Sequence, residues 1–391
     1  MASLSELGRI GAYNAEPEGV VGVRRVALTD EDAAGRGLVV SWFKDAGLDV
    51  SIDRIGNVYA DRAGQDASLA PVMAGSHIDS VPTGGRFDGA LGVLSALEAV
   101  RTLNDLNLIT TRPLTIAFFT DEEGCRFGTD MLGSAVATGR IGLDRALALR
   151  DAEGVSVGDE LDRIGYAGAE VVGLRRPAAF VECHVEQGPV LRREGFDLGV
   201  VTGVQGISWR RLTLTGSAAH AGATPTSYRK DAGLAAAHIN VLLREMCDSG
   251  EFGPELRATM GVIRPEPCSV NVIPGRVVAT VDLRNPDEAG LAAAEAALDA
   301  FCRELAEESG VSISSVQTAR TPPVVFCEAV QSVIAGVASE LALRHRPIVA
   351  GAGHDAQEWS RLCPTAMIFA PGERDGISHN PLEFSTPRQC G

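Results

Sequence analysis

The 391-residue sequence lacks a long apolar run and an excess of basic residues. Aspartate and glutamate number 51 against 35 lysines and arginines, which gives a formal net charge of −16. This balance argues against a partner such as duplex nucleic acid or an anionic membrane surface, because both are bound through cationic side chains. No apolar stretch approaches the ~18 residues that a membrane-spanning helix needs. We therefore expect neither a nucleic acid nor a membrane as partner.

The sequence also lacks closely paired cysteines and a recognisable leader. Its eight cysteines are scattered, and none forms a C-x-x-C pair. Scattered cysteines in a large chain are typical of reduced thiols in the cytoplasm. The first residues, MASLSELGRIGAYNAEPEG, show no basic stretch followed by an apolar core, as a secretory signal would. These features predict a cytoplasmic protein.

The first half of the chain alternates between strand-like and helix-like segments. Residues 114–120, LTIAFFT, form a nearly unbroken apolar run of the kind that a strand buried on both faces gives. Residues 88–103, which precede this run, have the composition of an apolar helix. This alternation predicts an α/β fold with a mainly parallel sheet flanked by helices.

The pattern changes near residue 207. Residues 207–320 read in order as strand, helix, two strands, helix and strand. The order βαββαβ is that of a ferredoxin-like unit. We therefore expect a catalytic domain over 1–206 and 321–391, with a small βαββαβ domain inserted at 207–320.

Histidines and acids cluster directly after the predicted strands of the larger domain. His77 and Asp79 follow one strand, Glu122 and Glu123 follow another, and His184 ends a third. Ligands of open α/β sheets bind beyond the carboxyl ends of the strands, so these side chains are expected to share one site.

Each cluster taken alone has an ordinary structural interpretation. A lone histidine is more often structural than a ligand, and an acidic run usually lies on a solvated face. Asp88 stands where a helix should begin, so it can be an N-cap or a carboxylate that bridges two cations. His379 lies in a Gly-rich segment near the C-terminus. Together, three histidines and several carboxylates suit a pair of divalent ions such as Zn²⁺.

The sequences of these clusters resemble a known family. The segments GSHIDSVPTGGRFDGALGVL, FFTDEEGCRFG, HVEQGPVL, HAGATPTSYRKDA, NVIPG, VDLRNPD, AGAGHDA and GISHNPLEFS run in order from residue 75 to residue 385. They are similar to the two-metal amidohydrolases of the aminoacylase/carboxypeptidase superfamily. HVEQGP in particular resembles the branch of N-carbamoyl-L-amino acid hydrolases, β-ureidopropionases and allantoate amidohydrolases.

The resemblance implies a role for each matched residue of the larger domain. His77, Asp88 and His184 would hold one divalent ion, and Asp88, Glu123 and His379 the other. Asp79 would be the partner of the His77 ring. Glu122 would be the general base that activates a hydroxide bridging the two ions.

The resemblance also implies substrate contacts. Gln187, Gly353 and His354 of the larger domain would line the pocket. The inserted domain would contribute His220, Asn271 and Arg284, with His220 also acting in catalysis by stabilising the developing oxyanion and Arg284 holding a carboxylate. In such proteins the inserted domain acts as a lid and forms the homodimer interface, through which His220 reaches the partner's site.

The expected reaction is hydrolysis of the ureido C–N bond of an N-carbamoyl amino acid, releasing the amino acid, carbon dioxide and ammonia. Allantoate and ureidoglycolate remain alternative substrates, and an N-acyl amino acid acylase or dipeptidase acting through the same ions is a further alternative. Zn²⁺ is the expected ion, with Mn²⁺, Co²⁺ and Ni²⁺ as alternatives, because His/carboxylate sites accept each of them.

Overall fold

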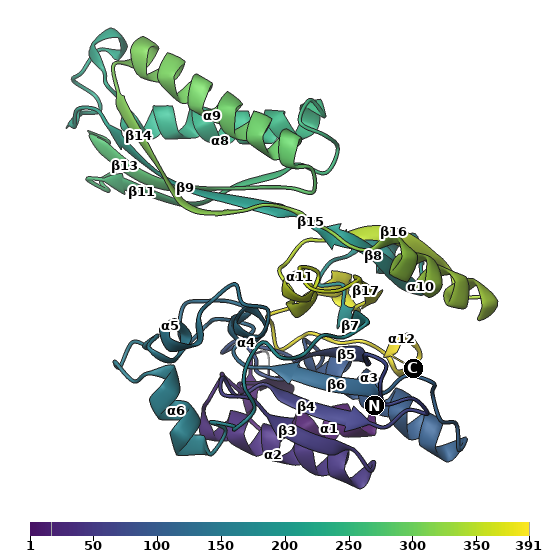
Figure 1. Cartoon of the computed structure of the whole chain (residues 1–391). Coiled ribbons are helices and arrows are strands. Elements are labelled where there is room, and N and C mark those ends of the chain that lie inside the picture. The colour runs from purple at the N-terminus through teal and green to yellow at the C-terminus, as the bar shows by residue number, and fades with distance from the viewer. Residues whose placement is uncertain (17, 391) are drawn as a thin grey trace. The chain divides into compact units, whose positions relative to one another are not determined.

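The computed structural model describes residues 1–16 and 18–390 and divides the chain into two compact units (Figure 1). Unit 1 comprises Met1–Gly203 together with Val325–Gly391, and unit 2 comprises Val204–Val324. The chain therefore leaves unit 1 once, forms unit 2 as one continuous segment, and returns to complete unit 1.

A sheet of nine strands, counted over the described residues, forms the centre of unit 1. Its order is β15-β8-β17-β7-β5-β6-β4-β3, with β16 beside β8. The four middle strands β17, β7, β5 and β6 are parallel, while β8, β4 and β3 pair antiparallel to their inner neighbours. The bounds of these strands are β3 (Asp49–Ile52), β4 (Val58–Arg62), β5 (Val72–His77), β6 (Leu114–Phe119), β7 (Ala179–Val185), β8 (Leu198–Val204), β15 (Val324–Val325), β16 (His345–Ala350) and β17 (Thr365–Ala370). The predicted α/β class with a mainly parallel central sheet is confirmed.

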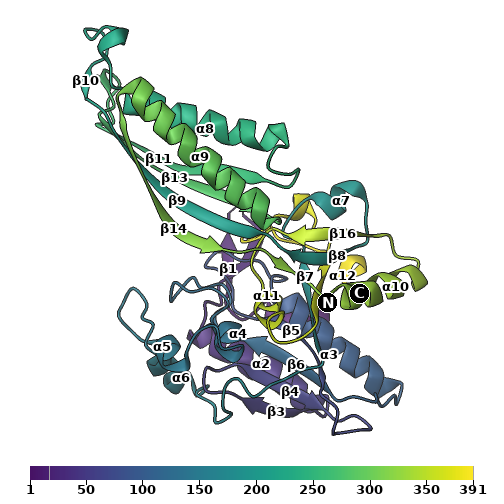
Figure 2. The ribbon, with the colours of Figure 1, turned by 45° about the horizontal axis from the view of Figure 1, so that its top comes forward.

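Helices and two short strands complete unit 1. They are α1 (Ala2–Leu7), β1 (Ala12–Ala15), β2 (Val20–Val23), α2 (Asp30–Asp45), α3 (Ala90–Asp105), α4 (Leu132–Ala137), α5 (Leu143–Leu147), α6 (Val157–Ile164), α7 (Val190–Glu194), α10 (Glu328–Glu340), α11 (Asp355–Trp359), the 3₁₀ turn η2 (Arg374–Gly376) and α12 (Pro387–Cys390). Figure 2 shows α2, α3, α4 and α11 gathered around the strands.

Strand β6 explains why the sheet is covered on both faces. Phe118 and Phe119 are adjacent residues of this strand, and both are fully buried. Successive residues of a strand point to opposite faces of the sheet. Phe118 lies 6.2 Å from Phe43 of α2, ring centre to ring centre. Phe119 lies 5.8 Å from Trp359 of α11. The apolar run read from the sequence therefore forms the middle of a helix–sheet–helix sandwich.

Unit 2 is a four-stranded antiparallel sheet packed against two long helices. The strands lie in the order β11-β13-β9-β14. Leu212, Leu283, Ile239 and Leu298 belong to its fully buried core. The element bounds are β9 (Gly206–Thr215), β10 (Ala219–His220), η1 (Thr226–Tyr228), α8 (Ala232–Ser249), β11 (Arg257–Glu266), β12 (Val272–Ile273), β13 (Arg276–Asn285), α9 (Glu288–Ser309) and β14 (Ser312–Thr321). The main elements thus follow one another as βαββαβ.

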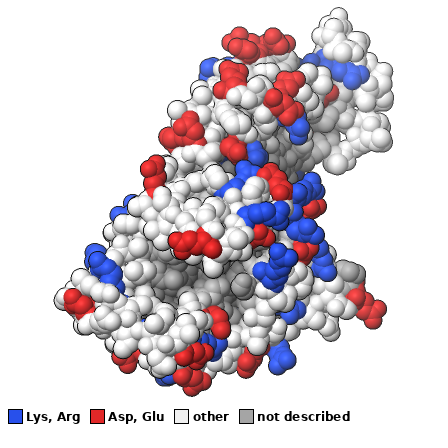
Figure 3. Space-filling model, turned by 90° about the vertical axis from the view of Figure 1, so that its right-hand side faces the viewer, with Lys and Arg blue, Asp and Glu red and all other residues white. Residues whose placement is uncertain are grey.

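Charged side chains of both signs are interspersed on the surface. The face in Figure 3 carries acidic and basic residues beside one another. In unit 1, Arg192 pairs with Glu373 at 3.0 Å and Arg193 with Asp375 at 2.8 Å. Among the described residues, no helix combines the length and the apolar character that crossing a bilayer requires.

Candidate metal centre

Three neighbouring parallel strands end at the same edge of the unit 1 sheet. His77 is the last residue of β5, and His184 is the penultimate residue of β7. The acidic turn Asp121–Glu123 begins one residue after Thr120, which follows β6. Because parallel strands carry their carboxyl ends to one edge, residues more than 100 positions apart in the sequence meet there.

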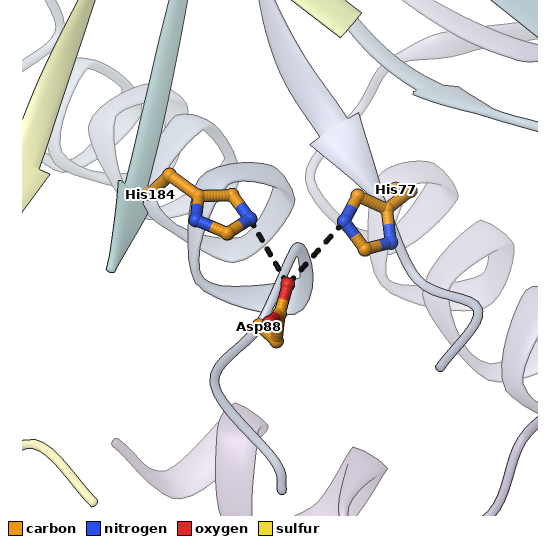
Figure 4. A group of neighbouring side chains, drawn as sticks. All are labelled: His77, Asp88 and His184. Atoms are coloured by element: carbon orange, nitrogen blue, oxygen red, sulfur yellow. Dashed lines mark ion pairs between the residues drawn. The ribbon is translucent and has the colours of Figure 1, made fainter. Parts of the chain in front are cut away.

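The first group of possible ligands consists of His77, Asp88 and His184 (Figure 4). Asp88 Oδ1 lies 3.1 Å from His184 Nε2 and 3.6 Å from His77 Nε2. One ligand atom from each residue lies within 4.8 Å of the others. All three side chains are buried. These are the three residues predicted for one ion.

The second group consists of Asp88, Glu123 and His379. His379 Nε2 lies 3.6 Å from Asp88 Oδ2 and 3.3 Å from Glu123 Oε2. Asp88 therefore directs Oδ1 toward the first group and Oδ2 toward the second. A carboxylate with one oxygen at each of two positions is arranged as a bridge.

Hydrogen bonds fix which nitrogen of two imidazoles is available. His77 Nδ1 lies 3.0 Å from the carbonyl oxygen of Asp79, and His184 Nδ1 lies 2.9 Å from that of Val185. A carbonyl only accepts, so each Nδ1 carries a proton in this arrangement. Nε2 of His184 in turn accepts from the backbone N–H of Gly89 at 3.1 Å. The Nε2 atoms of both rings thus face Asp88, and they are the nitrogens through which these side chains could bind a metal ion.

Asp88 does not cap the following helix. Helix α3 begins at Ala90, and its N-cap is Gly89, with φ at +62°. A Cβ atom at residue 89 would lie 2.4 Å from the His77 ring, so glycine is required there for both backbone and space. The Asp88 carboxylate is thereby left to face the imidazoles, and the N-cap interpretation is excluded.

Glu122 lies beside the first group. Its Oε2 atom is 3.5 Å from His77 Nε2, and the side chain is buried. Burial raises the pKa of Glu122 well above its usual value, and nearby Asp355 and Glu123 add to the rise while His77 opposes it. A carboxyl group with a raised pKa can take and return a proton near neutral pH.

The carboxylate of Asp79 holds the acidic turn as well as facing His77. It lies 3.8 Å from His77 Nδ1, whereas the shorter contact to that nitrogen comes from the Asp79 backbone. Its two oxygens accept the backbone N–H groups of Glu122 and Glu123 at 3.4 and 3.3 Å. The predicted partner of His77 thus also orients the turn that carries Glu122 and Glu123, because the buried amides there need an acceptor.

The charges of the cluster fit a pair of divalent cations. Asp88, Glu122 and Glu123 gather at one edge, and burial together with the charge of Asp88 raises the pKa of Glu123 well above its usual value. Glu123 Oε1 is buried without a hydrogen-bond partner. Imidazole nitrogens and carboxylate oxygens are the donors that Zn²⁺ and similar ions prefer. Cations would both neutralise the acids and satisfy this oxygen.

A cavity of about 140 Å³ opens onto the cluster. Three predicted substrate residues, Gln187, Gly353 and His354, line it. Gln187 donates through Nε2 to Asp88 Oδ2 at 2.9 Å, while its Oε1 is buried without a partner. The His354 ring centre lies 4.4 Å from that of His184, and its Nε2 is also buried without a partner. Burial and His184 lower the pKa of His354 well below its usual value.

The other three predicted substrate residues belong to unit 2. His220 on β10 is exposed, and its Nδ1 accepts the backbone N–H groups of Gly222 and Ala223 at 3.0 and 3.1 Å. The backbone oxygen of Asn271 accepts from Ala221, so His220 and Asn271 are neighbours within this unit. Arg284 on β13 bonds Asp282 through Nε and Nη2 at 3.0 to 3.1 Å. Their contacts with a substrate stay a prediction.

One buried acid behind the cluster, Glu182, was not among the predicted site residues. Glu182 and His354 form a third group of possible ligands with His184. Glu182 accepts from Ser76 Oγ at 2.6 Å and from the backbone N–H of Ala356 at 2.7 Å. Glu182 could have been found from the sequence because it stands two residues before His184, which places both side chains on the same face of β7.

Glu383 was missed as well, although it lies four residues after His379. It accepts the backbone N–H of Asp88, and burial followed by the charge of Asp88 raises the pKa of Glu383 to about 8. An acid between Leu382 and Phe384 was the available signal, because apolar neighbours indicate a buried segment.

The family model described as peptidase family M20/M25/M40 matches residues 73–390. The chain belongs to this family. The match includes the residues of both ligand groups, and the resemblance inferred from the motifs is confirmed. The family is generally dependent on a two-metal centre, which agrees with the donors gathered around Asp88.

The chain is also similar to curated proteins of one branch. It is 43% identical over 381 residues to the N-carbamoyl-L-amino-acid amidohydrolase of Rhizobium meliloti, covering 97% of this chain and 90% of that protein. A crystal structure of an amidase of the hydantoinase/carbamoylase family from Burkholderia multivorans superposes with a TM-score of 0.95 at 45% identity, covering 100% of this chain and 93% of that one.

Some relatives of this chain carry other names. The allantoate amidohydrolase of Bacillus subtilis is 34% identical over 384 residues, covering 97% of this chain and 92% of that protein. The ureidoglycolate hydrolase of Arabidopsis thaliana is 34% identical over 375 residues, covering 93% of this chain and 78% of that protein. These relatives are thus all named as hydrolases or amidohydrolases.

Proposed function

We propose that this protein is a metal-dependent amidohydrolase that cleaves the ureido C–N bond of N-carbamoyl amino acids. The observation that carries the proposal is the buried Asp88 carboxylate, which offers one oxygen to each of two His/carboxylate groups. The name of the Rhizobium meliloti relative supports this substrate class.

His77, Asp88 and His184 would hold one divalent ion, and Asp88, Glu123 and His379 the other. Bound at such a centre, divalent ions supply positive charge that lowers the pKa of water and polarises a carbonyl group. Zn²⁺ is our first choice, with Mn²⁺, Co²⁺ and Ni²⁺ as alternatives that the same donors accept.

Glu122 would act as the general base and then as the general acid. Its carboxylate takes a proton from the attacking water as the new C–O bond forms at the ureido carbon. It then gives that proton to the nitrogen of the amino acid as the C–N bond breaks. The carbamate released with the amino acid decays to carbon dioxide and ammonia. Asp79 keeps Glu122 in place by accepting its backbone N–H.

Unit 2 would supply the substrate's remaining contacts. Arg284 offers a planar guanidinium suited to a carboxylate, and His220 and Asn271 would contact the ureido group. We further propose that unit 2 acts as a lid and pairs two copies of the chain into a homodimer. Sedimentation equilibrium tests the pairing, and a monomer at micromolar concentration would contradict it.

A substrate panel on metal-reconstituted protein tests the function. We expect ammonia release from N-carbamoyl-L-amino acids to exceed that from allantoate and ureidoglycolate, and no cleavage of dipeptides or N-acetyl amino acids. A preference for allantoate or ureidoglycolate, the compounds that appear in the names of two relatives, would reassign the substrate. Cleavage of dipeptides alone would overturn the ureido assignment. Metal content near two ions per chain is expected throughout.

A further inference from the structure

The loop that carries Asp88 is tied to a distant segment of unit 1. Glu383 is buried, and its Oε1 atom accepts the backbone N–H groups of Phe87 at 2.8 Å and of Asp88 at 2.9 Å. The two segments are almost 300 residues apart in the sequence. One carboxyl oxygen of Glu383 thus binds two consecutive backbone N–H groups, those of Asp88 and of the residue before it.

A hydroxyl group links the same carboxyl to the side chain of Asp88. Ser378 Oγ lies 2.6 Å from Asp88 Oδ2 and 3.3 Å from Glu383 Oε2. Gln187 Nε2 approaches the same Oδ2 atom at 2.9 Å. Glu383 therefore contacts the backbone of Asp88 directly. Through Ser378 it also restricts the rotation of the Asp88 carboxylate.

Close packing shows that the loop has little freedom around this contact. A Cβ atom at Gly85 would lie 2.5 Å from the Cβ of Glu383. Phe87 packs edge-on against Phe384, with ring centres 5.9 Å apart. Neither Glu383 nor Ser378 belongs to either group of ligands that contains Asp88.

We infer that Glu383, acting with Ser378, is a positioning residue that sets the direction in which Asp88 presents its two oxygens to the paired ions. The inference rests on the proposed metal centre. Because Asp88 is shared, loss of this support is expected to weaken both ions together. Partners that orient a ligand typically contribute about 10- to 100-fold in metal affinity.

The test measures metal affinity of the full-length protein by competition between Zn²⁺ binding and a chromophoric chelator. Glu383→Ala is expected to weaken the affinity for both ions by about 10- to 100-fold. Glu383→Gln keeps an oxygen acceptor for the two N–H groups and is expected to retain affinity close to that of the unaltered protein. Gly85→Ala displaces Glu383 sterically and is expected to weaken the affinity in the same direction as Glu383→Ala.

Asp231→Ala is the matched control, because Asp231 Oδ1 also accepts two consecutive backbone N–H groups, those of Gly233 and Leu234, but in unit 2. It is expected to lower thermal stability without changing metal affinity. If Glu383→Ala does not fold, Ser378→Ala and Gly85→Ala carry the test. Unchanged affinity in the folded Glu383→Ala, Ser378→Ala and Gly85→Ala variants would overturn the inference. Absence of metal binding by the unaltered protein would instead contradict the proposed function.

Discussion

The ligand cluster of unit 1 and the polar residues of unit 2 differ in how completely each is built. Around Asp88 the side chains are mostly buried, and their free atoms face one another. His220 and Arg284 are instead partly or fully exposed, and each is engaged in hydrogen bonds within unit 2. The first arrangement is preorganised for cations before any substrate arrives. In the second arrangement the polar side chains already have hydrogen-bond partners within unit 2. Their contribution to function therefore depends on the ligand that binds them.

Removing the bridge is expected to have the largest effect. Asp88→Ala takes one donor from each ligand group and leaves His77, His184 and Glu123 without their shared partner. We expect loss of both ions and of turnover. Elemental analysis after dialysis measures the metal, and His220→Ala is the control that should keep both ions. Equal metal loss in the two variants would contradict the expectation that the ions are bound by unit 1 alone.

Removing the proposed base is expected to separate chemistry from metal binding. Glu122→Gln keeps the size of the side chain but cannot take a proton from water. We expect kcat to fall by about 10²- to 10⁴-fold, as for loss of a general base elsewhere. Metal content should remain at two ions per chain. Full activity with metal bound would remove Glu122 from the reaction.

Changing the guanidinium of unit 2 is expected to affect binding more than chemistry. Arg284→Lys loses the planar fork and the bond pattern to Asp282. One or two charged hydrogen bonds lost to a substrate carboxylate correspond to a rise in KM of about 10- to 100-fold, with kcat little changed. Arg257→Lys is the control, since Arg257 lines the same hollow of unit 2. A similar KM in both variants would contradict the proposed contact between Arg284 and the substrate carboxylate.

The smallest expected effect is a pH dependence of metal affinity. Burial lowers the pKa of His77, but Glu122, Asp88 and Asp79 outweigh burial and raise it well above the usual value. The ring therefore holds its second proton at a higher pH than a free imidazole, and a cation must displace that proton. Affinity should rise with pH, by about tenfold per unit for each proton released, until His77 is neutral without metal. Titrations at pH 6, 7 and 8 measure this slope, and a flat profile would show that no proton is displaced.

Much of unit 1 could be predicted because its signals are local. Residues 114–119 are apolar without interruption, and they form the doubly buried strand β6. The acids and histidines that follow β5, β6 and β7 reach one edge because parallel strands always do so. The same rule could not tell a bridging Asp88 from an N-cap, because that depends on where the helix begins.

The groups that were missed depend on contacts without sequence periodicity. Glu383 meets Asp88 through a segment after the last strand of the sheet, and no spacing rule relates the two. The backbone carbonyl of Asp79, rather than its carboxylate, makes the shorter contact with His77 because the carboxylate also serves two buried amides. Competition among several donors for one acceptor is visible only in three dimensions.

The α/β class, the family and the types of donor at the strand ends could all be inferred from the sequence, since apolar runs and the residues that follow them are properties of neighbouring positions. The three-dimensional structure was needed to see that Asp88 turns its two oxygens toward two groups of side chains, and that Glu383 and Ser378 hydrogen-bond to its backbone and its carboxylate. Those facts depend on the direction of single atoms, which is set by packing between segments far apart in the chain.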